Sequence, residues 1–286
     1  MRRKTSRCQG GCSTSQGACS RSSGAQSPLL DRRVCLRLLA GLAFATGSAR
    51  QAHAAIVDED VASRVFDLAS YSVVSISDFK VKDGVEVEEG TGSGIVWDRV
   101  GPHIVTNYHC IAKLAQDTTK TQRTVVGIEG ADGKLSQWPA RIVATDAAHD
   151  LAVLQIDAPP DTLQPIKLGS SKGLKVGQSV FAIGNPRGLS STMTAGVVSG
   201  LNRAIPSPVN TLTYGAIQTD APINGGSSGG ALLDSSGRLV GISTATFSRK
   251  GTGRGSGVNF ALPSDLVLDI VPKLIVYGNA SGKGLG

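Results

Sequence analysis

The feature that most constrains the fold of this chain is a series of short, apolar, β-branched runs separated by Gly, Asp and Pro. The runs lie at 71–79, 94–98, 103–106, 125–128, 140–144, 151–156, 180–183, 197–198, 216–218, 239–242 and 258–261. With 36 Gly and 12 Pro in 286 residues, turns are frequent and a helical bundle is disfavoured. Many short strands with turn signals between them predict an all-β barrel or sandwich.

Short helices are expected at the two ends of the folded part. Apolar residues at helical spacing predict a helix over 58–70, which Asp58 can cap. A second helix is expected over 266–277, interrupted at Pro272 and stopped by Gly278. The polar segment 80–90 predicts a loop or hairpin, and 279–286 predicts a flexible tail.

Residues 1–54 differ in composition from the rest of the chain. They hold nine of the Lys and Arg residues and a single acid, Asp31, so the net charge of +7 arises there and the remainder is close to neutral. A body without excess positive charge argues against nucleic-acid binding. Four of the five cysteines also lie in this segment, and Cys110 alone can form neither an intramolecular disulfide nor a four-ligand zinc site.

The same N-terminal segment carries two successive targeting signals. Residues 1–30 are rich in Arg, Ser and Gly and free of acids, which is typical of a transit peptide. An arginine pair at 32–33 then precedes an apolar stretch, 34–45, followed by an Ala-His-Ala cleavage triplet at 52–54. Together they predict a bipartite presequence for the chloroplast thylakoid lumen. The alternatives are a bacterial periplasmic export signal with a long n-region and a disordered tail. No uncharged apolar run is long enough for a membrane span, so at most peripheral membrane association is expected.

The segment 224–230, Asn-Gly-Gly-Ser-Ser-Gly-Gly, has the composition that an activated serine needs. Glycines around Ser228 permit a tight turn and a close approach of substrate to the backbone. The backbone of Gly226, Ser227 and Ser228 can direct its N–H groups to one point and form an oxyanion hole. On its own, a Gly- and Ser-rich loop is structural more often than catalytic.

A base and an orienting carboxylate stand upstream of this loop. His109 follows the strand expected at 103–106, and Asp150 directly precedes the strand expected at 151–156. Such an Asp can fix the tautomer of a histidine and stabilise its imidazolium. A lone His is more often a surface or core residue, and an Asp before a strand is more often a turn residue. The chain order of His109, Asp150 and Ser228 is, however, that of the two-barrel serine proteases.

Three blocks, TNYHC, HDLAVL and NGGSSGGAL, resemble the catalytic blocks of the Deg/HtrA (Do-like) serine proteases. Further matching segments are GSGIV, AIGNP, IQTDA and NFALP, at 92–96, 182–186, 217–221 and 259–263. The resemblance implies two six-stranded β-barrels of the chymotrypsin type in one protease domain over 55–278. With no PDZ domain expected after it, the chain resembles the PDZ-less branch of the thylakoid lumen. Two departures are Gly225-Gly226-Ser227, where the family usually has Pro-Gly-Asn, and Cys110, where it usually has an aliphatic residue.

The resemblance also implies a chemistry and a specificity. Acyl transfer to Ser228 with His109 as the base needs no cofactor or metal. The substrate pocket is expected at Pro222, Ile223 and Asn224. Because no acid stands between residues 221 and 227, a small to medium apolar side chain is the expected preference.

The same resemblance implies partners and a regulated state. Substrates would be unfolded or damaged proteins, in lumenal quality control and photosystem repair. A homotrimer or larger ring, or a hetero-oligomer with a related Deg protease, is implied, and Phe66 and Tyr71 are either packing residues of that interface or core. Loops at 185–194 and 245–257 gate activation in the family, or here are ordinary surface hairpins. The alternative function is a non-catalytic or chaperone-like subunit of a Deg complex.

Overall fold

The computed structural model describes residues 58–130, 132–186, 191–248 and 255–282, which all belong to one structural unit, Ala55–Gly286. The predicted presequence, the end of the predicted tail at 283–286 and the centres of both predicted gating loops lie outside the described residues. The domain boundaries therefore stay a prediction.

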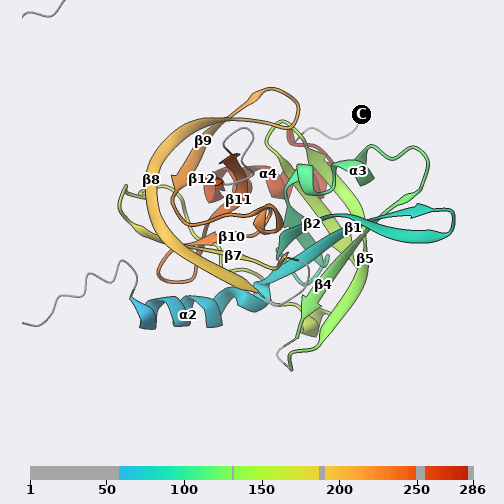
Figure 1. Cartoon of the computed structure of the whole chain (residues 1–286), viewed down its shortest axis with the longest axis horizontal. Coiled ribbons are helices and arrows are strands. Elements are labelled where there is room, and N and C mark those ends of the chain that lie inside the picture. Colours follow the sequence, from blue (N-terminus) through green and yellow to red (C-terminus); the bar gives the residue numbers. More distant parts are fainter. Residues whose placement is uncertain (1–57, 131, 187–190, 249–254, 283–286) are drawn as a thin grey trace, which may run out of the picture. The chain divides into compact units, whose positions relative to one another are not determined.

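The first half of the unit forms a closed six-stranded antiparallel barrel, ordered β1-β2-β3-β6-β5-β4 (Figure 1). Its strands are β1 (Val73–Lys82), β2 (Val85–Val96), β3 (His103–Thr106), β4 (Gln122–Glu129), β5 (Leu135–Asp146) and β6 (Leu151–Ile156). Short helical turns lie between them: η2 (Tyr108–Cys110), α3 (Ala112–Ala115) and, after β6, η3 (Pro160–Thr162).

The second half forms another closed six-stranded barrel, ordered β10-β11-β12-β9-β8-β7 (Figure 1). Its strands are β7 (Ser179–Gly184), β8 (Thr192–Pro206), β9 (Leu212–Thr219), β10 (Ala231–Leu233), β11 (Leu239–Ser248) and β12 (Gly255–Pro263). The 3-10 turn η5 (Gly225–Ser227) precedes β10. The predicted all-β, two-barrel fold is confirmed, whereas the three-residue strand β10 was not recognised as a separate strand in the sequence.

Several strands are apolar on both faces because each face packs against a different core. On β6, Ala152 and Leu154 belong to the interior of the first barrel, whereas Leu151 and Val153 join a shared cluster that also contains Phe181 of the second barrel. Successive side chains of a strand point to opposite faces, so a strand lying between two cores reads as a continuous apolar run. Each fully buried Leu or Val contributes about 1.5–3 kcal/mol to folding.

The polar segment 80–90 is a hairpin, one of the two possibilities that the sequence left open. Strands β1 and β2 pair as far as Lys82 and Val85, and only Asp83 and Gly84 lie between them. Both turn residues have positive φ, 53° and 79°. Asp-Gly is the pair that such a two-residue turn favours, because its geometry matches the twist of the strands.

Helices lie at both ends of the unit, as expected. Helix α2 (Glu59–Ala69) is capped by the Asp58 carboxylate, which accepts from two backbone amides, and the turn η1 (Ser70–Ser72) leads into β1. Helix α4 (Ser264–Tyr277) packs on β5 and β6 of one barrel and on β11 and β12 of the other.

The predicted interruption of the C-terminal helix is wrong, although its end is as expected. Helix α4 runs through Pro272 without a break and ends at Gly278, whose φ is 72°. Because Pro272 has no N–H, the carbonyl four residues before it lacks a helical hydrogen bond. Pro272 is exposed, so this carbonyl lies on the side of the helix that water can reach. Among the described residues, no helix has both the length and the apolar character to cross a membrane.

Candidate active site

The structure brings His109 and Asp150 together at one end of the first barrel. His109 lies in η2, directly after β3, and Asp150 lies at the turn before β6. The His109 Nδ1 is 2.8 Å from one Asp150 carboxylate oxygen and 3.1 Å from the other. The His109 amide donates to the same carboxylate over 3.0 Å. With Nδ1 committed to Asp150, Nε2 is the nitrogen left to accept a proton from a nucleophile.

Asp150 is held by its backbone as well as by its side chain. Its carbonyl accepts from the Tyr108 amide at 3.1 Å and from the Asn107 side chain at 3.0 Å. Its φ is 56°, a left-handed conformation that costs a non-glycine residue about 1–2 kcal/mol. The residue is 5% exposed, so its charge is buried but hydrogen-bonded. These contacts fix the carboxylate against the imidazole.

Thr244 of β11 is a third partner of this carboxylate and comes from the second barrel. Its hydroxyl donates to Asp150 over 2.5 Å. Thr244 is not among the residues expected from the sequence, because it lies in an ordinary β-branched strand without a local signal. Only the packing of the two barrels brings β11 to the turn before β6.

Ser228 follows η5 and lies against the same strand. It is 6% exposed, and its hydroxyl donates to the Thr244 carbonyl over 3.2 Å. Within the described part of the chain, no hydrogen bond joins Ser228 to His109. Catalytic hydrogen bonds are often long or misaligned in unliganded structures and tighten when substrate binds. If Ser228 is the nucleophile, its hydroxyl must leave the Thr244 carbonyl and donate to His109 instead.

The residues expected to form the oxyanion hole lie on a tight turn. The Ser227 amide donates to the Asn224 carbonyl over 2.9 Å, which closes the 3-10 turn, and the Gly230 amide donates back to Ser227 over 3.0 Å. Gly229 has a φ of 84°, which allows the chain to reverse directly after Ser228. Gly226 and Ser228 thus stand at the two sides of Ser227 on one short turn.

The residues expected to form the substrate pocket have different environments. Ile223 is 4% exposed and packs in the core of the second barrel, with Val180 and Leu232. Pro222 and Asn224 are exposed, and the Pro222 carbonyl accepts from the Thr194 hydroxyl over 2.7 Å. Of these three residues, only Pro222 and Asn224 are exposed, so the buried Ile223 side chain does not fit the expected pocket.

The electrostatic state of His109 is set by its neighbours. Burial of the ring disfavours its charged form, but hydrogen bonds with Asp150 and with Cys110, together with their charges, outweigh burial and raise the pKa of His109 above its ordinary 6.5. Cys110 also points its thiol at the Ser228 carbonyl, 3.6 Å away, and packs against the core of the first barrel. Its role is therefore partly that of the small hydrophobe expected at this position.

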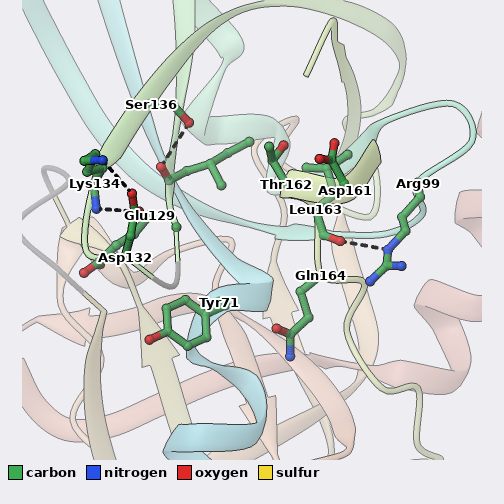
Figure 2. Close-up of a pocket in the computed structure, with 12 residues that line it drawn as sticks. Tyr71, Arg99, Glu129, Asp132, Lys134, Ser136, Asp161, Thr162, Leu163 and Gln164 are labelled. Carbon is green, nitrogen blue, oxygen red and sulfur yellow. Dashed lines mark hydrogen bonds and ion pairs between the residues drawn. The ribbon is translucent and has the colours of Figure 1, made fainter. Parts of the chain in front are cut away.

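A separate cavity of about 530 Å³ opens on the first barrel (Figure 2). In this view Arg99 and the Lys134–Asp132 ion pair lie on opposite sides of it, with Tyr71 between. None of His109, Asp150 and Ser228 lines this cavity. Tyr71 is 38% exposed, whereas Phe66 packs against the core, so the core alternative fits Phe66 better than Tyr71.

Residues 92–242 match the family of trypsin-like peptidase domains, which is more than half of the chain. The crystal structure of Deg5 superposes with a TM-score of 0.66 and 48% identity, over 78% of this chain and 99% of that one. The chain belongs to the Do-like (Deg/HtrA) trypsin-like peptidases. A structure of the HtrA-type protease AlgW with a tripeptide is 34% identical, with a TM-score of 0.60, over 76% of this chain and 64% of that one.

Curated Do-like proteases give the same family. Protease Do-like 5, chloroplastic, of Arabidopsis thaliana is 57% identical over 192 residues, or 67% of this chain and 59% of that protein. Protease Do-like 8, chloroplastic, of the same plant is 48% identical over 230 residues, or 78% of this chain and 51% of that protein. The periplasmic serine endoprotease DegP of Escherichia coli is 38% identical over 196 residues. The chain thus covers between half and three fifths of the length of these two plant relatives.

Proposed function

We propose that this chain is a serine endopeptidase that cleaves unfolded or damaged proteins in the thylakoid lumen. The observation that carries the proposal is the two-point contact of His109 with the buried Asp150 carboxylate, while Ser228 and Asp150 are both hydrogen-bonded to the same residue, Thr244. The family to which the chain belongs supports the same chemistry.

Each residue has a defined part in the proposed reaction. His109 takes the proton of Ser228 at Nε2 while the hydroxyl oxygen attacks a peptide carbonyl. Asp150 keeps the imidazole in the required tautomer and stabilises its charged form. The amides of Gly226 and Ser228 donate to the oxygen that becomes negative. His109 then returns the proton to the leaving amine, and water releases the acyl group by the same steps in reverse order.

The proposed setting rests on the sequence and on the relatives. The presequence pattern of residues 1–54 favours the lumen, and two plant relatives carry the word chloroplastic in their names. A bacterial periplasmic location is the alternative, as for DegP. Exposed apolar segments of misfolded proteins suit a pocket without an acid, and photosystem repair would supply such substrates. Assembly with copies of itself or with a related Deg protease is part of the proposal.

A chaperone-like, non-catalytic subunit is the second candidate. The observation that favours it is the Ser228 hydroxyl, which donates to Thr244 and not to His109. In that state the Ser228 hydroxyl lacks the hydrogen bond to a base that an activated nucleophile needs.

Labelling with a fluorophosphonate separates the two candidates. The full chain is incubated with the probe at roughly pH 5 to 10, because the pKa of His109 is raised from 6.5 to about 10 and the base is neutral only toward the upper end of that range. A protease is labelled, and Ser228→Ala abolishes both labelling and cleavage of an unfolded protein. Ser235→Ala, at an exposed serine in the β10–β11 turn, is the control that should label like the wild type. Absence of labelling at every pH, with retained suppression of aggregation, would establish the chaperone instead.

A further inference from the structure

Ser93 of β2 connects the first barrel to the turn that carries Ser228. It is fully buried, with 0% exposure. Its amide donates to the Ser228 carbonyl over 2.8 Å, and its own carbonyl accepts from the Thr106 hydroxyl over 2.7 Å. The backbone of Ser93 is therefore fixed between β3 and the turn of the second barrel.

The side chain of Ser93 makes two further hydrogen bonds to backbone groups of the second barrel. Its hydroxyl donates to the Gly226 carbonyl over 2.7 Å and accepts from the Asn185 amide over 2.8 Å. A hydroxyl has one proton to donate, so this proton is committed to Gly226. The Asn185 amide then orients the oxygen from the other side.

Ser93 thus binds the carbonyls of both residues whose amides are proposed to form the oxyanion hole. The amide of Ser93 holds Ser228, and its hydroxyl holds Gly226. The N–H and the carbonyl of one residue are separated only by that residue's φ and ψ rotations. Fixing the two carbonyls therefore restricts the backbone rotations that would turn the two amides away from a common point. The two contacts are a reason for the two donors to stay aligned without substrate.

The packing around the turn gives it little room to move elsewhere. A Cβ placed on Gly226 would lie 2.5 Å from the Pro186 Cβ, and one on Gly184 would lie 2.9 Å from the Ser227 Cα. The end of β7 and the residues after it therefore abut the turn directly. The turn is therefore hydrogen-bonded to Ser93 and is also in van der Waals contact with the segment 184–186.

We propose that Ser93 is a positioning residue that aligns the Gly226 and Ser228 amides for the oxyanion. The proposal rests on the proposed peptidase function, since it concerns the transition state of that reaction. Preorganised donors act on the charge that develops in the transition state, so their loss lowers kcat more than it raises KM. Removing one oxyanion donor outright costs about 10²–10³ in kcat. Loosening both through Ser93 is expected to cost about 10- to 100-fold.

The test compares Ser93→Ala with Ser264→Ala in the full chain. Ser264 is also 0% exposed, and its hydroxyl donates to the Gly169 carbonyl over 3.2 Å, so the control removes an equivalent buried hydrogen bond in another element. kcat and KM are measured for a peptide substrate, per site titrated with the fluorophosphonate. Ser93→Ala should lower kcat about tenfold or more and leave KM within about twofold. Ser264→Ala should keep kcat while its melting temperature falls.

A second pair keeps the proposal testable if Ser93→Ala does not fold. Ser93→Thr and Ser93→Val have the same shape and differ by the hydroxyl, so both meet the same crowding. The Thr variant should retain most of the kcat of the wild type, and the Val variant should not. The pH at which the rate changes should be equal in both, because His109 is not altered.

The outcomes distinguish this inference from the proposed function. A wild type that neither labels nor cleaves disproves the peptidase, and the role of Ser93 falls with it. An active wild type together with Ser93→Ala that keeps its kcat per titrated site overturns only the role of Ser93. Equal kcat values for the Thr and Val variants do the same.

Discussion

The Thr244 hydroxyl donates to the Asp150 carboxylate across the junction of the two barrels, with 2.5 Å between the oxygen atoms. The backbone carbonyl of the same Thr244 accepts from Ser228. One residue of the second barrel therefore contacts both outer members of the candidate triad, while His109 is held from the first barrel. The two barrels must be docked for the three groups to meet.

Thr244→Val is expected to lower kcat about 10- to 100-fold. The change keeps the side-chain shape but removes a hydrogen bond to a buried charge, which is worth about 1.5–3 kcal/mol. Asp150 then holds the imidazole less rigidly. Thr244→Ser restores the donor and should recover most of the rate in the same peptide assay. A Val variant with the kcat of the wild type would show that Asp150 needs no support from β11.

The activity is expected to rise with pH, with its midpoint above 6.5. His109 must be neutral to accept a proton, and its contacts with Asp150 and Cys110 raise its pKa. As pH falls through this raised pKa, the imidazole becomes charged and kcat/KM declines. The measurement is kcat/KM against pH for the wild type. A midpoint at or below 6.5 would contradict the raised pKa.

His149→Gln is the control for this profile. His149 also pairs with an aspartate, since its Nδ1 is 2.6 Å from an Asp146 oxygen, but among the described residues its side chain forms no hydrogen bond with the candidate triad. Its removal should leave the midpoint of the profile unchanged. Asp150→Asn should instead lower the rate by about four orders of magnitude, as expected when the orienting carboxylate loses its charge.

Most of the fold could be predicted because strand positions are encoded locally. Runs such as 103–106 and 151–156 coincide with strands β3 and β6, since an apolar β-branched run between two cores has a strong signal. Strand β10 could not be predicted because it has only three residues and no turn residue separates it from the Gly-rich segment before it. The continuity of α4 through Pro272 could not be predicted either. An exposed position allows a helix to accommodate a proline, and exposure depends on tertiary packing.

The candidate site was predictable only in part, for a related reason. His109, Asp150 and Ser228 each stand in a recognisable local segment, and the structure places His109 beside Asp150. Thr244 and Ser93 act through contacts between residues far apart in the chain. No local pattern marks Thr244, and the GSGIV segment that contains Ser93 does not indicate which groups Ser93 contacts. The hydrogen-bond acceptor of the Ser228 hydroxyl could not be predicted from the sequence either, because it depends on which acceptor the fold places nearest.

Asp78→Asn is expected to stabilise the protein above about pH 6. Asp78 is 4% exposed, and burial raises its pKa from 3.8 to about 6, although the Thr124 hydroxyl partly opposes this. The folded state thus binds the proton more tightly than the unfolded state. Its stabilising contribution is complete below 3.8 and is lost as pH rises through about 6. At about 1.4 kcal/mol per pH unit, the loss approaches about 3 kcal/mol.

The measurement is urea unfolding of wild type and variant between about pH 4 and pH 7, which brackets the pKa values expected for such a carboxyl group. The Asn variant should match the wild type near pH 4 and exceed it near pH 7, because it has no carboxyl group to ionise. Asp67→Asn, at an exposed position of α2, should show no such crossover. Parallel stability curves for Asp78→Asn and the wild type would contradict the effect of burial.

Gly229→Ala is expected to prevent formation of an active site through steric overlap. A second glycine with a similar positive φ, Gly173, separates this overlap from backbone strain. Gly229 has a φ of 84°, and a Cβ there would lie 2.1 Å from the Ser93 carbonyl oxygen and 2.4 Å from the Thr106 hydroxyl. Gly173 has nearly the same φ, 86°, but a Cβ there meets no atom within 4 Å. Gly173→Ala should therefore cost only the backbone strain, about 1–2 kcal/mol, and should keep its labelling. Gly229→Ala adds steric overlap with backbone atoms of β2. Its melting temperature should therefore lie well below that of Gly173→Ala, and Ser228 should not be labelled. Equal melting temperatures for the two variants would mean that the turn can shift away from β2.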